Sequence, residues 1–147
     1  MITVRVHPED FDVGGELARL EALGGGAVAS FTGIVRGGDD FISMTLDHYP
    51  AMTHAALEAL AAKATARWPL HGVTIIHRVG ELMRGERIVL VATASDHRAA
   101  ALEACSFLID RLKTDAPFWK KEHRTDGSAD EWVSAKETDG AAKARWK

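Results

Sequence analysis

The sequence holds a single cysteine among its 147 residues and has no long hydrophobic run. One cysteine cannot form an internal disulfide, which is typical of proteins in the reducing cytosol. A membrane-spanning helix needs about 18 or more consecutive apolar residues, and no stretch approaches that length. The N-terminal stretch MITVRVHPED lacks the pattern of a signal peptide, because polar residues interrupt the apolar ones at once. We therefore expect a cytoplasmic protein.

An excess of positive charge and the motifs of common cofactor sites are also missing. The formal net charge is −3, so general affinity for nucleic acid is not expected. The seven histidines form no HExxH motif and no pair four residues apart, and one cysteine excludes a CxxC pair. Neither GxxxxGK[ST] nor GxGxxG is present, which argues against a nucleotide-hydrolysing fold. We expect neither a metal nor another cofactor.

The apolar pattern predicts strands and helices that alternate along one domain, residues 1–147. Strands are expected at 2–7, 27–36, 41–49, 72–80 and 87–95, and the last is apolar on both faces, as a central strand is. The glycine-rich turn 37–40 makes 27–49 a hairpin, and 81–86 is expected to be a loop. A final pair of strands is expected at 118–124 and 130–137. These elements predict an α+β fold (α/β hammerhead-like) with a mixed or antiparallel sheet, two main helices and a C-terminal β pair.

Three helices are predicted: a short one over 13–23, a second from Pro50 to Pro69, and the longest from a cap at Ser95 or Asp96 to about Ala116. The two longer helices each carry an apolar stripe, formed by Met52, Ala56, Leu60, Ala64 and Trp68 in one, and by Leu102, Cys105, Leu108, Ile109 and Leu112 in the other. Because Cys105 falls in such a stripe, we expect a core residue rather than a nucleophile, which would need exposure and a positive neighbour.

Positive charge is concentrated in one stretch. Residues 111–124 carry five basic and two acidic side chains, a local charge of +3 that suits a particular anionic ligand. In a strand, Phe118 and Lys120 share one face while Trp119 and Lys121 share the other. A partly desolvated lysine beside other cations can act as acid, base or nucleophile. Lys113, however, also suits the C-terminal end of a helix, where the dipole favours a cation, so the residues alone leave a site and a solvated surface equally open.

Two more cationic positions are candidates for binding an anion. His97 and Arg98 are expected in the first turn of the longest helix, where free N–H groups and the dipole favour a phosphate. Arg36 ends a predicted strand beside two glycines, where a guanidinium can grip a carboxylate or phosphate with two hydrogen bonds. Arg98 reaching a distant carboxylate, and Arg36 as an ordinary surface arginine, remain alternatives.

Seven motifs, in order along nearly the whole chain, resemble the large, catalytic subunit of molybdopterin synthase: FTGIVR, LDHYPAMT, ARWPL, VTIIHRVGEL, ASDHR, LKTDAPFWKKE and EWVSAKE. The resemblance implies a sulfurtransferase of molybdenum cofactor biosynthesis. In that family, a small ubiquitin-like subunit carries sulfur as a thiocarboxylate on its C-terminal Gly-Gly. The enzyme transfers this sulfur to cyclic pyranopterin monophosphate and forms the dithiolene of molybdopterin.

The resemblance also implies roles for individual residues. It makes Lys113 and Lys120 catalytic, and it places substrate binding at Arg36, His97, Arg98, Lys121, Glu122, Ile34 and Val35. The sequence departs from the family in two places. Ile34 stands where some relatives carry a lysine, as in FTGKVR, so an ionic role is lost there. The loop at 37–40 looks short for the family.

The spacing of two of these residues predicts more than one copy of the chain. His97 and Lys113 lie on one predicted helix, and a rise of 1.5 Å per residue separates their Cα atoms by roughly 24 Å. Because that is too far for one small pocket, we expect a homodimer with composite sites. One chain would supply Lys113 and Lys120 and the other His97 and Arg98. With the small partner the assembly becomes a heterotetramer, as the resemblance implies.

A second class of function stays possible on sequence grounds. The basic aromatic strand at 118–124 would suit a non-enzymatic binding module that docks an acidic partner. Such a module predicts that Lys120→Ala weakens binding uniformly and with a strong dependence on salt. An enzyme predicts that the same change removes turnover and leaves partner binding nearly intact.

Overall fold

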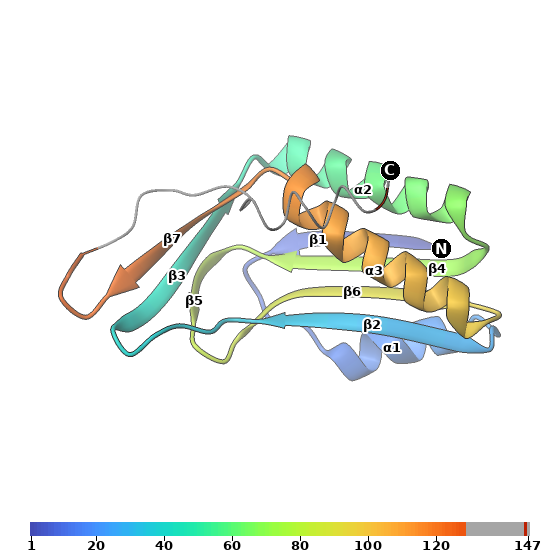
Figure 1. The fold of residues 1–147 in the computed structure, drawn as a ribbon, viewed down its shortest axis with the longest axis horizontal. Helices are drawn as coiled ribbons and strands as arrows, with labels where there is room; N and C mark the ends of the chain where they lie inside the picture. The colour runs from blue at the N-terminus through green and yellow to red at the C-terminus, as the bar shows by residue number, and fades with distance from the viewer. Residues whose placement is uncertain (129–145, 147) are drawn as a thin grey trace.

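The computed structural model describes residues 1–128 and 146, which form two β-sheets and three helices (Figure 1). The strands are β1 (Ile2–His7), β2 (Ala27–Ile34), β3 (Phe41–His48), β4 (Leu70–Arg78), β5 (Gly80–Met83), β6 (Arg87–Ser95) and β7 (Phe118–Arg124). The helices are α1 (Val13–Glu21), α2 (Pro50–Arg67) and α3 (Arg98–Asp115). None of the described helices is long and apolar enough to cross a membrane. The α+β class predicted from the sequence is confirmed.

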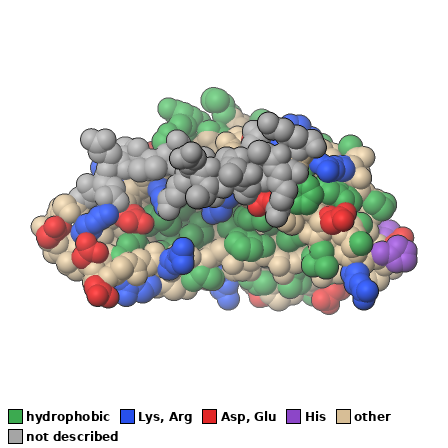
Figure 2. All heavy atoms as spheres, viewed as in Figure 1, with side chains coloured by type: hydrophobic (Ala, Val, Ile, Leu, Met, Phe, Trp, Pro, Cys, Tyr) green, Lys and Arg blue, Asp and Glu red, His purple; other side chains and the backbone are tan. Residues whose placement is uncertain are grey.

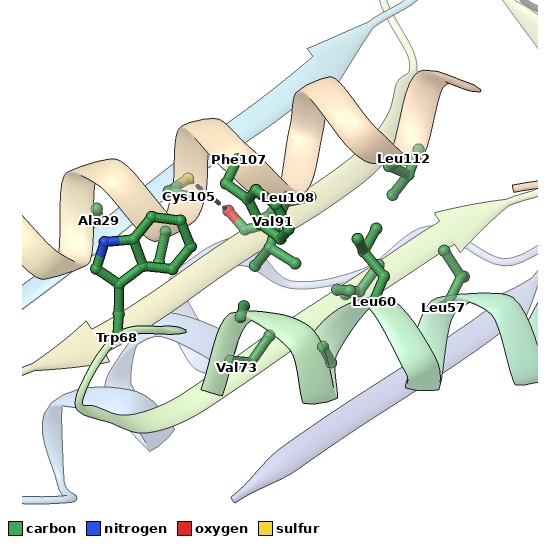
Figure 3. Close-up of a cluster of buried hydrophobic side chains, with 14 of the residues drawn as sticks. Ala29, Leu57, Leu60, Trp68, Val73, Val91, Cys105, Phe107, Leu108 and Leu112 are labelled. Carbon is green, nitrogen blue, oxygen red and sulfur yellow. Dashed lines mark hydrogen bonds between the residues drawn. The ribbon is translucent and has the colours of Figure 1, made fainter. Parts of the chain in front are cut away.

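The larger sheet has the strand order β1-β4-β6-β2, in which β1 and β4 are parallel and the other pairs antiparallel. The inner position of β6 confirms the prediction made from its apolar faces. Helices α2 and α3 cover one face of this sheet, where Leu57 and Leu108 pack with Val73 and Val91 (Figure 3). Helix α1 covers the other face, where Leu20 packs with the strand residues of a second cluster.

The smaller sheet has the order β5-β3-β7 and extends from one end of the larger one (Figure 1). Its buried side chains form a third apolar cluster, made of Val35, Met44, Leu46 and Leu82. The strand expected at 118–124 is therefore confirmed, and it pairs antiparallel with β3. Its expected partner at 130–137 lies outside the described residues.

The hairpin expected over 27–49 is wrong, because its two strands belong to different sheets. β2 pairs with β6, whereas β3 lies between β5 and β7. The side chain of Val35, directly after β2, packs in the third cluster. Its N–H donates to the carbonyl of Glu86, and its carbonyl accepts from the N–H of Gly85. A glycine-rich turn indicates only local geometry, and the strand partners follow from which edges and faces remain to be buried. For the same reason the loop expected at 81–86 is partly strand, since β5 pairs with β3.

Both helix stripes are partly wrong. Met52 and Leu102, the first member of each, are 64% and 60% exposed. The stripe of α2 repeats every four residues, which advances about 40° beyond a full turn at each step, so its first and last members drift onto different faces. In α3 the first steps are of three residues, each about 60° short of a full turn, so Leu102 falls at the edge of the stripe. The buried face of α2 instead follows a mixed spacing of three and four, at Thr53, Leu57, Leu60, Ala61 and Ala64. On α3 it comprises Ala101, Ala104, Cys105, Phe107, Leu108 and Leu112.

Candidate functional site

A sharp corner joins the end of α3 to the start of β7. The helix ends at Asp115, Ala116 is extended, and the N–H of Phe118 donates to the carbonyl of Ala116 at 2.9 Å. The buried hydroxyl of Thr53 on α2 donates to the carbonyl of Pro117 at 3.4 Å. Proline cannot continue the helix, because it lacks an N–H and restricts the residue before it. The corner is therefore set by local sequence and held by a neighbouring helix.

The two lysines that the resemblance makes catalytic lie on either side of this corner. Lys113 is exposed in the last turn of α3, and Lys120 lies two residues beyond Phe118 on β7 (Figure 1). The two ammonium groups therefore come from two different elements, the end of α3 and the strand β7.

The register of β7 assigns its side chains to two faces. Lys120 lies opposite Leu46, and Phe118 opposite His48, so these side chains share the face that includes the third core cluster. Trp119 lies opposite Asp47 on the other face, with Lys121 opposite Thr45. This is the alternation that the sequence predicted, and it separates Lys120 from Lys121.

Two histidines stack on Phe118. The ring of His77, from β4, lies 3.7 Å from that of Phe118 between centroids, at an interplanar angle of 15°. His48, from the end of β3, stacks more loosely at 6.2 Å. Its Nδ1 is buried and has no hydrogen-bond partner in the part of the chain that the structure describes. The stack connects the smaller sheet to the larger one directly beneath the lysine-bearing corner.

His77 is uncharged at neutral pH. Its side chain is almost fully buried, and desolvation lowers its pKa from the ordinary 6.5 to about 3. The bond between Nδ1 and the Arg78 carbonyl, at 2.7 Å, opposes this shift in part, while the charges of Lys113 and His48 add to it.

A depression of about 290 Å³ lies where the end of β3 meets the start of β7. Its lining residues are Asp47, His48, Tyr49 and Trp119. Tyr49 and Trp119 meet edge to face with their centroids 4.8 Å apart, and Tyr49 is exposed. This aromatic surface is next to the lysine corner along the strand but faces the other way.

The residues after β2 occupy different environments. Ile34 ends the strand and is exposed, Arg36 is exposed, and Val35 between them is 2% exposed in the third cluster. The side chain of Val35 is therefore part of the core, whereas those of Ile34 and Arg36 face solvent. Beyond Lys120 on β7, Glu122 lies near Arg124, with 3.8 Å between charged atoms.

His97 and Arg98 lie at the opposite end of α3 from Lys113 (Figure 1). Figure 2 shows histidine side chains at that end of the molecule. The predicted cap is wrong, because the helix begins at Arg98 with His97 as its N-cap residue. The carboxylate of Asp96 is hydrogen-bonded to Nε2 of His71 at 2.7 Å, and the hydroxyl of Ser95 donates to the carbonyl of Pro69. The structure thus does not bring this pair to the lysine corner within one chain.

Sequence reasoning missed His48 and His77 as the residues that stack on Phe118. Each is a single histidine within a strand, and such a residue gives no local signal of a site. Their only signal was membership in the HYP.M and HR.GEL motifs on which the resemblance rests. Among residues 1–128 and 146, no group of three or more His, Cys, Asp or Glu side chains could hold a metal ion.

Cys105 is buried, as its place in the apolar stripe predicted (Figure 3). Desolvation raises the pKa of its thiol to about 11, and Sγ donates weakly to the carbonyl of Val91 at 3.6 Å. We expect the native protein to resist iodoacetamide at pH 8 and to react fully once unfolded in guanidinium, with Cys105→Ala retaining activity. Mass spectrometry follows the labelling, and rapid alkylation of the native state would contradict the inert, buried thiol.

The depressed pKa of His77 predicts destabilisation by acid. Between pH 6.5 and about 3 the unfolded state binds a proton that the folded ring does not, so the free energy of unfolding falls as the pH drops. The slope from this residue approaches about 1.4 kcal/mol per pH unit and vanishes above pH 6.5. Urea unfolding from pH 7.5 to 4.5 should show a shallower slope in His77→Phe than in the wild type. If the free energy of unfolding fell equally with pH in both proteins, the assignment of this acid sensitivity to His77 would be refuted.

Comparison with known proteins places the chain in a class. The model of the MoaE protein family matches residues 6–115. The molybdopterin synthase catalytic subunit of Mesorhizobium japonicum is 54% identical over 99% of this chain and 93% of its own length. A solved MoaE protein from Burkholderia ambifaria is 50% identical, with a TM-score of 0.85 over 99% of this chain and 98% of that one. One chain of a solved complex of subunits 1 and 2 of the Helicobacter pylori molybdopterin-converting factor is 25% identical, with a TM-score of 0.74 over 91% and 90%.

The fold and these relatives define a biosynthetic enzyme subunit of the sulfurtransferase class. The chain belongs to the MoaE family, the catalytic subunits of molybdopterin synthase. The family match includes α3 with Lys113, and the full-length relatives extend it over β7 and Lys120.

Proposed function

We propose that this chain transfers sulfur to cyclic pyranopterin monophosphate, with Lys113 and Lys120 as its catalytic residues. The observation that supports the assignment of residues is the corner between α3 and β7, because the two lysines lie on either side of it. The sulfur comes from a thiocarboxylate at the C-terminus of a small ubiquitin-like partner, and the product is the dithiolene of molybdopterin.

The chemistry needs positive charge at a particular place. Each transfer forms a carbon–sulfur bond at a substrate carbon, which loses a carbon–oxygen bond in exchange, and the departing oxygen takes up a proton. It also breaks the carbon–sulfur bond at the carboxyl carbon of the partner, where water supplies the oxygen that leaves a carboxylate. An ammonium group can orient the anionic thiocarboxylate, stabilise the oxyanion that forms when water adds, and pass a proton. Two lysines on separate elements can act on both reacting groups, the thiocarboxylate of the partner and the substrate. Because Cys105 is buried and its thiol protonated, the sulfur is not carried by this chain.

The phosphate and pterin of the substrate require further groups. We assign these to Arg36, His97 and Arg98, with Ile34, Val35, Lys121 and Glu122 bordering the same region. Because His97 and Arg98 lie at the far end of α3 from Lys113, they reach a lysine corner only from a second copy of the chain. The proposal therefore includes a homodimer in which each site takes residues from both chains.

The assembly includes a second kind of subunit. The Helicobacter pylori structure is a complex of subunits 1 and 2 of its molybdopterin-converting factor, and this chain resembles one of its chains. We propose the same arrangement here, with one small partner at each site of the homodimer, giving a heterotetramer. We further propose that residues 1–147 act as one domain and work in the cytoplasm, where the single thiol stays reduced.

The deciding experiment is reconstitution. The purified chain is mixed with thiocarboxylated partner and cyclic pyranopterin monophosphate, and the dithiolene product is measured by mass spectrometry. The matched control is the same partner ending in an ordinary carboxylate, which has no sulfur to give. Product from the first mixture alone supports the proposal, and absence of product from a properly folded protein would overturn it.

A further inference from the structure

Trp146, the second-to-last residue, packs against the core cluster that α2 and α3 form with the larger sheet. Its indole meets the rings of Trp68 and Phe107 at 5.9 and 5.8 Å between centroids, and interplanar angles of 80° and 89° make both contacts edge to face. Trp68 and Phe107 themselves meet at 5.2 Å. Trp68 directly follows α2 and Phe107 lies in the middle of α3 (Figure 3). The indole therefore bridges the two helices.

The polar groups of Trp146 have partners in the same place. Nε1 of the indole donates to the carboxylate of Asp110 at 2.6 Å, a short bond to a charged acceptor. The guanidinium of Arg67 donates to the backbone carbonyl of Trp146 at 3.3 Å and lies 5.5 Å from the centroid of its ring. The same guanidinium lies over the rings of Trp68 and Phe107, at 4.8 and 5.6 Å, within the range of cation–π attraction.

These contacts distinguish tryptophan from other apolar residues. Phenylalanine, leucine and methionine have no side-chain N–H, so none of them could make the bond to Asp110. The rings below the indole are fixed before it arrives, because Trp68 and Phe107 are buried and Nε1 of Trp68 donates to Glu103 at 3.0 Å. A preorganised surface of this kind loses little freedom when a ligand binds.

The sequence around Trp146 suits this surface in charge. Residues 141–147, AAKARWK, carry three basic side chains and no acidic one. The surface of α3 contributes the carboxylates of Glu103 and Asp110. The contacts of Trp146 described above are made by its side chain and its own carbonyl, so they do not depend on the covalent path by which the indole reaches the surface.

We propose that four residues form a binding site for a tryptophan side chain on a short basic peptide: Arg67, Trp68, Phe107 and Asp110. Its occupant in this protein is the chain's own Trp146, which joins α2 to α3. The same segment, supplied as a separate peptide, should bind when Trp146 is removed. The proposal does not rest on sulfur transfer, because its groups are distinct from those assigned to that reaction.

A peptide added to the full-length protein tests the site. Trp146→Ala leaves the site empty, and the peptide AAKARWK is titrated into this variant and followed by calorimetry. We expect one peptide to bind per chain with a Kd of about 0.1 mM or lower. Apparent binding to the wild type should be about 10-fold weaker, because its tethered Trp146 competes at an effective concentration of about 1 mM. The peptide AAKARAK, which keeps the charge and lacks the indole, is the matched control.

A second substitution isolates the indole N–H. In the Trp146→Ala protein, adding Asp110→Ala should weaken binding of AAKARWK by about 10-fold or more, the range for one lost hydrogen bond to a charged group. The peptide AAKARFK, which keeps a ring but has no N–H, should bind the Trp146→Ala protein about 10-fold more weakly than AAKARWK does. Its affinity should then be unaffected by Asp110→Ala, because the two changes remove the same bond.

The outcomes can be told apart. Equal binding of AAKARWK and AAKARAK, equal binding by the wild type and Trp146→Ala, or no binding at about 1 mM peptide would each overturn the proposal. An equal loss of affinity for AAKARWK and AAKARFK in the Asp110→Ala protein would also overturn it. If Trp146→Ala does not fold, the milder Trp146→Phe takes its place as the protein titrated. Binding requires no turnover, so a protein that makes no dithiolene would count against the proposed function alone.

Discussion

Lys120→Ala and Lys113→Ala are each expected to lower the turnover of dithiolene formation by about 10²- to 10⁴-fold, the range for removing a positioned acid–base group. Both side chains project from the corner between α3 and β7, and no other lysine of the described residues lies on those elements except Lys121, which faces the other side of the strand. The loss should appear in kcat, because the lysines act on charge that develops during the reaction.

Two further measurements give this prediction its controls. Lys63→Ala removes an equal charge from the exposed surface of α2 and should retain wild-type turnover. Calorimetric titration with the small partner should show nearly unchanged affinity for Lys120→Ala. If Lys120→Ala instead weakens partner binding uniformly, with a strong dependence on salt, the strand is a docking surface and the catalytic assignment fails.

A mixture of two inactive variants is expected to recover activity. When Lys113→Ala and Arg98→Ala chains are combined, a mixed dimer with composite sites holds one site with both residues intact and one site with neither. Random exchange at equal amounts should therefore restore about a quarter of wild-type turnover, since half of the dimers are mixed and half of their sites are intact.

Mixing before and after subunit exchange provides the internal control. Each variant alone should be nearly inactive, and recovery should appear only after the dimers have been dissociated and reassembled together. If Lys113 and Arg98 served one site within a single chain, every site in the mixture would lack one of them. Activity no higher than that of either parent would refute the shared site.

The sequence predicted most single elements of the fold because their signals are local. Pro50 and Pro117 mark where a helix begins and where one has ended, and 87–95 carries the apolar pattern of an inner strand. These predictions are confirmed to within a few residues, the usual uncertainty of element ends. The helix stripes failed in part, because steps of four residues in α2 and of three residues in α3 drift around the helix by about 40° and 60° each.

Only part of the candidate site was predicted, because only part of it has a local signal in the sequence. The lysines stood out because positive charge surrounding a proline and two aromatic residues is visible along the chain. His48 and His77 did not, since their neighbour Phe118 is far away in sequence and no local pattern links the three. Val35 was grouped with Ile34 and Arg36 by the resemblance, but only the folded chain shows its side chain buried in the core.

By itself the sequence determined the family, the elements, the buried thiol and the stretch of positive charge, because side-chain chemistry and short-range periodicity can be read along the chain. Tertiary structure alone decided that β2 and β3 enter different sheets and that His77 lies against Phe118. Strand pairing and side-chain stacking depend on which edges and faces are left to bury once all elements pack together. That competition involves the whole chain, so no single stretch of sequence contains its result.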